Sequence, residues 1–310
     1  MEKFAILADV TCDLVEEFQQ QFDIHVLHGY VIPPNKQEVR AMPAWDWCTR
    51  EEFYRDLKRT PEAYTTAPPN VNDFYTAMEE YAQRQQPLLV MTLSGGMSGT
   101  HAFAQQARTM VLERYPDAKI YCFDSRRFGP GFGLMAVHAA LCRERGMSFD
   151  ETVAWLEDNK SCFHQAGWHE DLAFVAKKGR ITHAKAFFGT LAGVRPLGEF
   201  DANGMTTVIT KVKGTRTALR VLQSYIEATA TRPEEQVFFV GHSNRPKQAA
   251  EYKALIEERF HPKACYISDV HASCGVNAGP GLVAAYYMGK PISKDLEEER
   301  KLIERLAEEG

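Results

Sequence analysis

The chain has 310 residues, of which 45% are hydrophobic and 25% are charged, a balance typical of a globular protein long enough for two domains. Its formal net charge of −5, without a block of Lys or Arg, argues against nucleic acid as the main partner. No apolar stretch approaches the ~20 residues that span a bilayer, and no leader-like apolar region follows Met1. We therefore expect a soluble, cytoplasmic protein.

Strands and helices alternate along the first half of the chain. Apolar residues 4–8 predict a buried strand, residues 13–22 an amphipathic helix, and residues 25–32 a second strand that ends before Pro33-Pro34. The further elements predicted in this half are a helix capped by Thr49, a helix over 70–83, a strand over 88–93, a helix after Thr100, a strand over 120–123, and helices over 135–142 and 148–159. Repeated β-α-β-α order predicts a parallel sheet with helices on both faces.

The second half has a different pattern, which predicts a mixed sheet. Residues 172–175 predict a short strand, and Asn203-Gly204 is the turn signal of a hairpin. The other predicted elements are a strand over 206–209, a helix over 215–229, a strand over 237–240, a helix over 246–260, a strand over 265–267, an apolar helix that residues 274–281 open, and a charged surface helix over 294–309.

The expected fold is therefore α/β, with two α/β domains and a ligand cleft between them. We place the boundary near residues 160–170, which gives an N-terminal parallel-sheet domain over 1–165 and a C-terminal mixed-sheet domain over 166–310. Residues 275–290 could pack back at the interdomain cleft. The sequence favours a monomer only weakly.

The cysteines and histidines do not predict a metal site. The seven cysteines are odd in number and include no CxxC pair, so we expect most of them to be free and partly buried. The pairs His271/Cys274 and His25/His28 have ligand-like spacing, but neither has a second pair nearby to complete a four-ligand set. We expect no metal, no cofactor and no catalytic residue.

Three turns rich in small residues recur at the ends of predicted elements. They cover residues 93–100, 177–182 and 274–281. Gly and hydroxyl residues at such turns would expose backbone N–H groups beside a helix N-terminus, which is a site for a carboxylate or a phosphate. Residues 184–194 are small and apolar, and would suit one wall of a narrow apolar channel.

Two features of these turns leave alternatives open. The segment from Gly96 to Thr100 is close to the G-x-S-x-G elbow of hydrolases, but the fifth position is Thr100 rather than Gly. A hydrolase and a turn without function therefore both remain open. Arg180 suits bidentate recognition of a carboxylate or phosphate, yet it could instead form an ion pair with Asp124 or Asp9.

Six landmarks occur in the order found in one protein family. They are residues 9–14 (D-V-T-C-D-L), 65–69 (T-T-A-P-P), 93–100 (L-S-G-G-M-S-G-T), 123–126 (F-D-S-R), 177–197 (K-K-G-R-I-T through R-P-L) and 279–281 (G-P-G). On these motifs the chain resembles the DegV family of bacterial fatty-acid-binding proteins over nearly its whole length.

The resemblance implies two α/β domains that hold a long-chain fatty acid between them. Members with known roles present this acid to a fatty acid kinase, whose acyl phosphate product feeds phospholipid synthesis. The member itself would be a carrier with no catalytic nucleophile, in transient contact with a membrane surface at most.

The resemblance also implies the residues that bind the carboxylate. The family's Thr corresponds to Thr65, its Arg to Arg180 and the first residue of its Ser-Ser pair to Ser94. The chain departs from the family where Gly95 replaces the second Ser and Asn277 the His before Gly-Pro-Gly. The expected ligand-binding set is Thr65, Thr66, Ser94, Gly95, Gly96, Ser98, Arg180, Asn277 and Gly279.

The acyl chain and the carboxylate of such a ligand would contribute different amounts to the binding free energy. Burying ~15 methylenes at ~0.8 kcal/mol each gives on the order of 12 kcal/mol before entropic costs, while a hydrogen bond to the carboxylate adds roughly 1.5–3 kcal/mol. The altered head-group residues also suit a lipid-ligand sensor that acts on a protein partner. A third alternative is an acyl hydrolase or transferase that uses Ser98 or Ser94.

Overall fold

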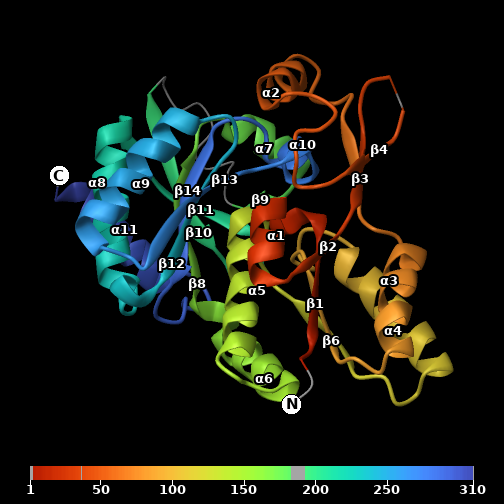
Figure 1. Cartoon of the computed structure of the whole chain (residues 1–310). Coiled ribbons are helices and arrows are strands. Elements are labelled where there is room, and N and C mark those ends of the chain that lie inside the picture. The colour runs from red at the N-terminus through yellow and green to blue at the C-terminus, as the bar shows by residue number, and fades with distance from the viewer. Residues whose placement is uncertain (1–2, 36, 183–192, 310) are drawn as a thin grey trace. The chain divides into compact units, whose positions relative to one another are not determined.

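The computed structural model describes residues 3–35, 37–182 and 193–309. The chain forms two compact units (Figure 1). The N-terminal unit contains Met1–Trp47, Glu62–Lys160 and His271–Val276, and the C-terminal unit contains Cys48–Pro61, Ser161–Val270 and Asn277–Gly310. Two short segments, 48–61 and 271–276, thus belong to a different unit from their neighbours in sequence. A single boundary near residue 165 does not describe this division.

The N-terminal unit is built on a four-stranded parallel sheet. Its strands are β1 (Ala5–Asp9), β2 (His25–Leu27), β6 (Leu88–Thr92) and β7 (Ile120–Asp124), in the order β2-β1-β6-β7. The parallel sheet predicted from β-α-β-α order is confirmed. Both faces of every inner strand are apolar, as a parallel sheet covered on both sides requires.

Helices cover the two faces of this sheet. On one face, α3 (Val71–Gln83) and α4 (Thr100–Arg114) pack against alternate strand residues. On the other face lie α5 (Gly129–Glu144) and α6 (Phe149–Asn159), where the Phe4 and Phe149 rings meet edge to face at 5.9 Å (Figure 1). The two-sided cover predicted from the sequence is therefore present in this unit.

Two predicted elements of the N-terminal unit differ in their bounds. Helix α1 (Glu16–Phe22) begins three residues after the predicted start, because Val10–Cys12 forms a 3-10 turn, η1, that ends at Asp13 with φ +53°. Residues 25–32 form two strands rather than one. The second, β3 (Gly29–Ile32), leaves the parallel sheet and pairs with β4 (Val39–Ala41) and β5 (Thr65–Ala67) in a small antiparallel sheet of order β4-β3-β5.

Capping boxes begin three helices, and those at Thr49 and Ser148 confirm the caps predicted from the sequence. Thr49 caps α2 (Arg50–Arg59), Asn70 caps α3 and Ser148 caps α6, each in a reciprocal capping box with the acidic residue three positions later. Each side-chain oxygen accepts a hydrogen bond from a backbone N–H that would otherwise lack a partner in the first turn. These helices therefore begin where the sequence predicts.

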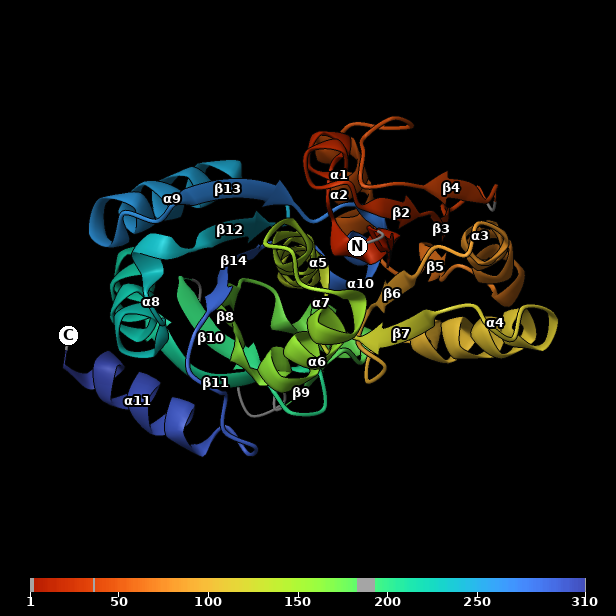
Figure 2. The ribbon, with the colours of Figure 1, turned by 60° about the horizontal axis from the view of Figure 1, so that its bottom comes forward.

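The C-terminal unit is built on a seven-stranded mixed sheet of order β13-β12-β14-β8-β10-β11-β9. Its strands are β8 (Phe163–His169), β9 (Ile181–Thr182), β10 (Val194–Phe200), β11 (Thr206–Lys213), β12 (Val237–His242), β13 (Ala264–Asp269) and β14 (Leu282–Met288). Helices α8 (Thr215–Thr229), α9 (Pro246–Phe260) and α11 (Glu297–Glu308) pack on one face of this sheet, over its main apolar core (Figure 2). The predicted mixed sheet is confirmed. Among the described residues, 3-10 turns also precede β8 and β12, namely η2 (Lys160–Cys162) and η4 (Pro233–Glu235).

Two predictions for the C-terminal unit were wrong. Residues 172–175 are not a strand but part of helix α7 (Leu172–Lys178), because the Asp171 side chain caps the N–H of Phe174 and Gly179 ends the helix at φ +73°. The apolar run after Gly281 is not a helix but the strand β14, which pairs with β8 and β12 and follows the short helix α10 (Ala272–Ala278).

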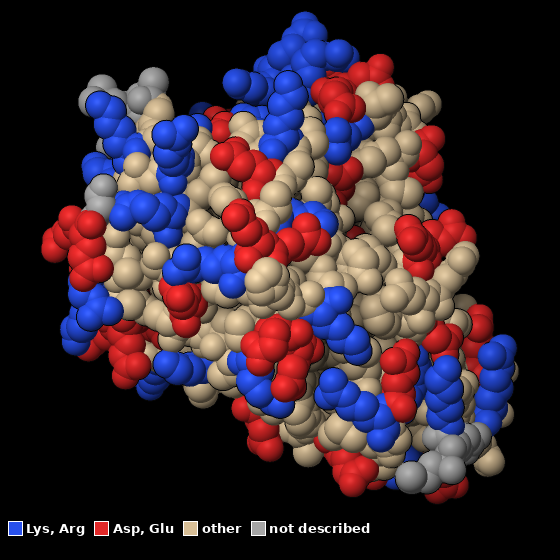
Figure 3. Space-filling view, turned by 60° about the vertical axis from the view of Figure 1, so that its left-hand side comes forward, with Lys and Arg blue, Asp and Glu red and all other residues tan. Residues whose placement is uncertain are grey.

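The sequence analysis missed β8, which lies at the expected domain boundary. Most of the predicted channel wall, residues 184–194, lies outside the described residues. Within the part of the chain that the structure describes, no helix is long and apolar enough to cross a membrane. Figure 3 shows a face on which basic and acidic side chains are interspersed.

A buried polar network lies under α8 in the C-terminal unit. The Glu199 carboxylate, which is 0% exposed, contacts the His164 ring and the Tyr225 hydroxyl. The Tyr287 hydroxyl bonds with that of Thr229 at 2.7 Å, and the Tyr287 ring stacks on His164 with centroids 5.1 Å apart. This network joins β8, β10, β14 and α8 inside an otherwise apolar core.

Candidate functional site

The turn after β6 is the first of the predicted anion-binding turns. Ser94 is 0% exposed at its start, and its carbonyl accepts hydrogen bonds from the N–H groups of Met97 and Ser98. The Ser94 Oγ accepts a further bond from the N–H of Gly96 at 3.2 Å. The Ser98 Oγ lies 2.8 Å from that of Thr100, at the start of α4. Hydroxyl and carbonyl groups of the turn thus accept hydrogen bonds from within the turn itself.

Two aspartates, from the strands on either side of β6, fix this turn. Asp9, at the end of β1, accepts from the N–H of Leu93 at 2.6 Å, while its other oxygen accepts from the N–H of Thr11. Burial raises the pKa of Asp9, and these hydrogen bonds lower it in part. Asp124, at the end of β7, accepts from the N–H of Gly95 at 3.1 Å. Both carboxylates therefore accept hydrogen bonds from backbone N–H groups of this turn.

These contacts change how the turn can bind an anion. The N–H groups of Gly95 and Gly96 already donate to Asp124 and to Ser94, so neither points freely at a ligand. A Cβ atom at position 95 would lie 3.0 Å from the Asp124 Oδ2, which explains why a small residue suits this position. The Ser94 hydroxyl accepts from Gly96 and still has its own hydrogen to donate.

Thr65 and Thr66 lie on β5 of the small antiparallel sheet. Thr66 pairs with Val31 and Thr65 with Ile32 on β3. Thr65 is exposed and Thr66 is half-buried. The two side chains point to opposite faces of this sheet, because successive strand residues alternate, so one bound carboxylate would face only one of them from the sheet.

Arg180 follows α7 directly after the helix-ending Gly179. Its guanidinium donates to the carbonyl of Lys178, and its side chain is exposed. The turn therefore keeps Arg180 next to the C-terminal end of a helix that already carries Lys177 and Lys178 in its last turn. The alternative ion pairs of Arg180 with Asp124 or Asp9 stay predictions.

Asn277 and Gly279 lie at the end of α10 and just beyond it. Gly279 has φ +68°, and a Cβ there would lie 2.4 Å from the Phe174 ring, while Gly281 has φ +111°. Only glycine adopts these conformations without strain. His169, at the end of β8, donates from Nε2 to the carbonyl of Ala278 at 2.7 Å and so fixes this segment.

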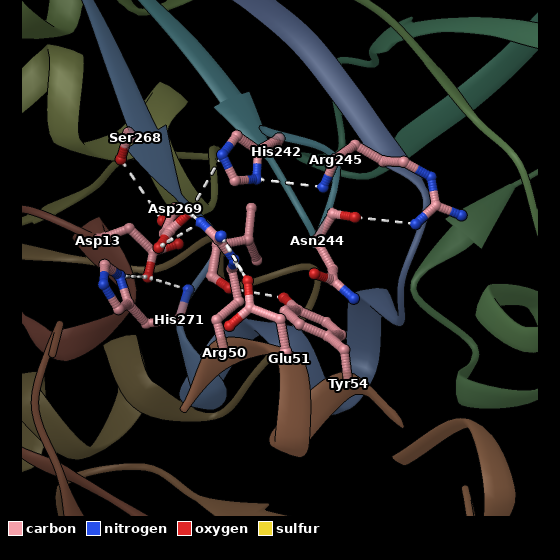
Figure 4. A network of polar contacts seen from close by, with 11 residues as sticks. Asp13, Arg50, Glu51, Tyr54, His242, Asn244, Arg245, Ser268, Asp269 and His271 are labelled. Carbon is pink, nitrogen blue, oxygen red and sulfur yellow. Dashed lines mark hydrogen bonds and ion pairs between the residues drawn. The ribbon is translucent and has the colours of Figure 1, made fainter. Parts of the chain in front are cut away.

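Sequence reasoning missed a polar network in the C-terminal unit (Figure 4). Asp269, at the end of β13, accepts from Arg50 on α2 at 3.0 Å and lies 3.1 Å from the Nε2 of His242, at the end of β12. The Tyr54 hydroxyl donates to the carbonyl of Val270 at 2.5 Å. These contacts hold α2 on the C-terminal unit. The contact between His242 and Asp269 could have been predicted, because parallel strands such as β12 and β13 bring the polar residues at their carboxyl ends together at one edge of the sheet.

A second polar contact drawn in Figure 4, between Asp13 and His271, belongs to the N-terminal unit. Asp13 accepts from the backbone N–H of His271 at 3.0 Å and lies 3.3 Å from its Nδ1 (Figure 4). The His271 ring also lies 5.2 Å from that of Trp45. His271 is thus held in place by the segment that begins α10, far in sequence from Asp13.

The described residues do not build a hydrolase or a metal centre. Ser94 and Ser98 form hydrogen bonds with backbone groups and with Thr100, and no histidine lies within hydrogen-bond distance of them among the residues described. His101 instead bonds with Thr92 through Nδ1. In the same described part of the chain, no group of three or more His, Cys, Asp or Glu side chains could hold a metal ion.

Comparison with known proteins decides the family. A family model described as "Uncharacterised protein, DegV family" matches residues 3–290. The chain belongs to the DegV family. A DegV domain-containing protein of Clostridium perfringens is 28% identical over 291 residues, which cover 93% of this chain and 98% of that protein.

Solved structures of DegV proteins share the fold. The structure of Bacillus subtilis DegV, described as a fatty acid binding protein, is 25% identical, with a TM-score of 0.78 over 94% of this chain and 100% of that one. A protein of Eubacterium ventriosum described as stearic acid-binding is 21% identical, with a TM-score of 0.81 over 93% of this chain and 98% of that one. Both are built on the α/β fold described above.

Proposed function

We propose that this chain binds a long-chain fatty acid and presents its carboxylate to a fatty acid kinase. The observation that carries the proposal is the DegV family match over residues 3–290, together with the fold shared with Bacillus subtilis DegV, a fatty acid binding protein. The stearic acid-binding neighbour suggests stearate as the first probe. In this role the chain is a cytoplasmic carrier, without catalytic residues, that touches membranes only in passing, and the kinase forms the acyl phosphate for phospholipid synthesis.

In the turn over residues 93–100, we assign the carboxylate contact to a side chain rather than to the backbone amides of Gly95 and Gly96. The Ser94 hydroxyl has a hydrogen to donate, whereas the N–H groups of Gly95 and Gly96 are engaged within the turn. Arg180 would supply the positive charge, since an arginine is the strongest partner for a carboxylate. The remaining proposed contacts are Thr65, Thr66, Ser98, Asn277 and Gly279.

The two ends of the ligand then have separate roles. Burial of the acyl chain supplies most of the affinity, on the order of 12 kcal/mol for ~15 methylenes before entropic costs. A charge-assisted hydrogen bond supplies roughly 1.5–3 kcal/mol and sets the orientation of the carboxylate. Loss of a head-group contact should therefore impair presentation to the kinase more than retention of the lipid.

Arg180→Ala tests this division. We expect the variant to retain most of its copurified fatty acid, while the rate at which a fatty acid kinase with ATP forms acyl phosphate from it falls about tenfold or more, the equivalent of one charged hydrogen bond. Ser94→Ala should act in the same direction. The measurement pairs mass spectrometry of extracted lipid with a coupled assay of ATP consumption.

The control is Lys177→Ala, a basic residue in the last turn of the helix that precedes Arg180. It should leave both readouts near those of the unchanged protein. Equal losses of lipid and of phosphorylation in Arg180→Ala would contradict separate roles for the two ends. Bound lipid that no kinase modifies, even in the unchanged protein, would favour the sensor.

A further inference from the structure

A row of small residues crosses the sheet of the C-terminal unit. The cross-strand pairs are Ser268 with Gly241, Gly241 with Ala284, Ala284 with Gly167 and Gly167 with Gly198. Residues that pair directly lie on the same face of a sheet. All five are buried. The row therefore runs perpendicular to the strands, from β13 through β12, β14 and β8 to β10.

This row lies on the face away from α8 and α9. The residues next to it in sequence, among them Val240, Val283, Ala285, Ala166 and Trp168, belong to the apolar core under those helices. Because successive strand residues alternate between faces, the small residues must point to the opposite side. Four spacings of about 4.8 Å between five strands give about 19 Å, roughly the length of an extended 16-carbon chain.

A second row, two residues along each strand, borders the first and is almost wholly aromatic. Phe239 pairs with Tyr266 and with Tyr286, and Tyr286 pairs with Gln165. The Phe200 and Tyr286 rings approach to 6.3 Å on the same side. Gln165 is therefore the one amide in a row of aromatic side chains.

The Gln165 side chain is poorly suited to a purely apolar surface. It is 2% exposed, and its Oε1 has no hydrogen-bond partner among the residues that the structure describes. Its backbone N–H donates to the Glu199 Oε1 at 2.6 Å, which fixes the strand at this point. A buried acceptor without a donor is costly, and an apolar side chain of the same shape would avoid that cost. A donor on a ligand would remove it.

We propose that Gln165 accepts a hydrogen bond from a hydroxyl group on the acyl chain, so that this protein prefers a hydroxylated long-chain fatty acid to an unsubstituted one. The inference rests on the proposed fatty acid binding and names its ligand class. In the complex that we propose, the acyl chain lies along the row of small residues, the aromatic row contacts its methylenes, and the amide recognises its one polar group. Gln165 is thus a specificity-determining residue, distant in sequence from the head-group turns.

The test compares stearate with hydroxystearates that carry the hydroxyl at carbon 3, 10 or 12. Delipidated protein is mixed with equal amounts of the four acids, and the bound acid is quantified by native mass spectrometry. We expect one hydroxystearate to be preferred to stearate by about tenfold, which corresponds to a difference of about 1.4 kcal/mol in binding free energy. In Gln165→Leu the preference should disappear while stearate binds at least as well as before.

A matched control and a second variant keep the test decisive. Gln106→Leu removes an exposed amide on α4 and should keep the preference. Gln165→Met guards against a packing defect that is specific to leucine, and both substitutions should leave the melting temperature unchanged or higher. Equal binding of all four acids by the unchanged protein, or an unchanged preference in both Gln165 variants, would overturn the inference. Failure of all four acids to bind would instead overturn the proposed function, and the inference with it.

Discussion

Glu199→Ala is expected to lower the free energy of unfolding by about 3–5 kcal/mol, the usual cost of removing one partner from a buried charged network. The Glu199 Oε1 accepts from the N–H groups of Gln165 at 2.6 Å and Phe200 at 2.8 Å. The Oε2 accepts from the His164 Nδ1 at 2.8 Å and the Tyr225 hydroxyl at 2.9 Å. Four donors would lose their acceptor at once, inside a core from which water is excluded.

The His164 ring makes this loss harder to absorb. Its Nε2 donates to the carbonyl of Lys290 at 2.7 Å, so its Nδ1 cannot turn to another acceptor without breaking that bond. Urea unfolding followed by circular dichroism measures the effect. Glu297→Ala, which removes an exposed glutamate from a surface ion pair with Lys301, should change stability by less than about 0.5 kcal/mol. A loss below about 1 kcal/mol in Glu199→Ala would show that the network is not a source of stability.

His169→Gln is expected to make the protein less sensitive to acid. Burial lowers the pKa of His169 to about 4, from 6.5 in an unfolded chain. The contacts fix the neutral ring, since Nε2 donates to Ala278 and Nδ1 accepts from the N–H of Asp171 at 3.0 Å. Because the unfolded chain binds a proton first as pH falls, stability is full above pH 6.5 and is lost between about pH 6.5 and 4, by about 3 kcal/mol in all.

The measurement is the free energy of unfolding at pH 7 and pH 4.5 for both proteins. The glutamine can still donate to the Ala278 carbonyl, but it carries no titrating group, so its loss on acidification should be about 2–3 kcal/mol smaller than that of the unchanged chain. His261→Asn, at an exposed histidine after α9, serves as the control and should keep the full loss. The same acid loss in His169→Gln as in the unchanged protein would contradict the assignment.

Features that depend on a few neighbouring residues could be predicted from the sequence. The caps at Thr49 and Ser148 are confirmed because their hydrogen bonds join residues only three positions apart. The run of four apolar residues at 172–175 favours a strand, because so short a run shows no helical periodicity. The cap at Asp171 and the stop at Gly179 were present in the sequence and outweighed that preference.

Features of the candidate site that join distant segments could not be predicted in this way. The turn at residues 93–100 could be located from its composition, but not the direction of its N–H groups. Asp124, 29 residues after Gly95, takes the amide on which anion binding was expected to depend. The row through Gly167, and the aromatic row beside it that contains Gln165, follow from the register of five strands, which a single sequence does not contain.

The central claim is that this DegV family chain carries a fatty acid, and its most direct test is native mass spectrometry of the protein purified without detergent. The account predicts a complex heavier than the bare chain by roughly 250–300 Da, the mass of an acid whose burial dominates the affinity, and release of that mass as a free fatty acid on organic extraction. The account would be contradicted if the purified protein has the mass of the bare chain and keeps that mass after the delipidated protein is mixed with stearate and the hydroxystearates.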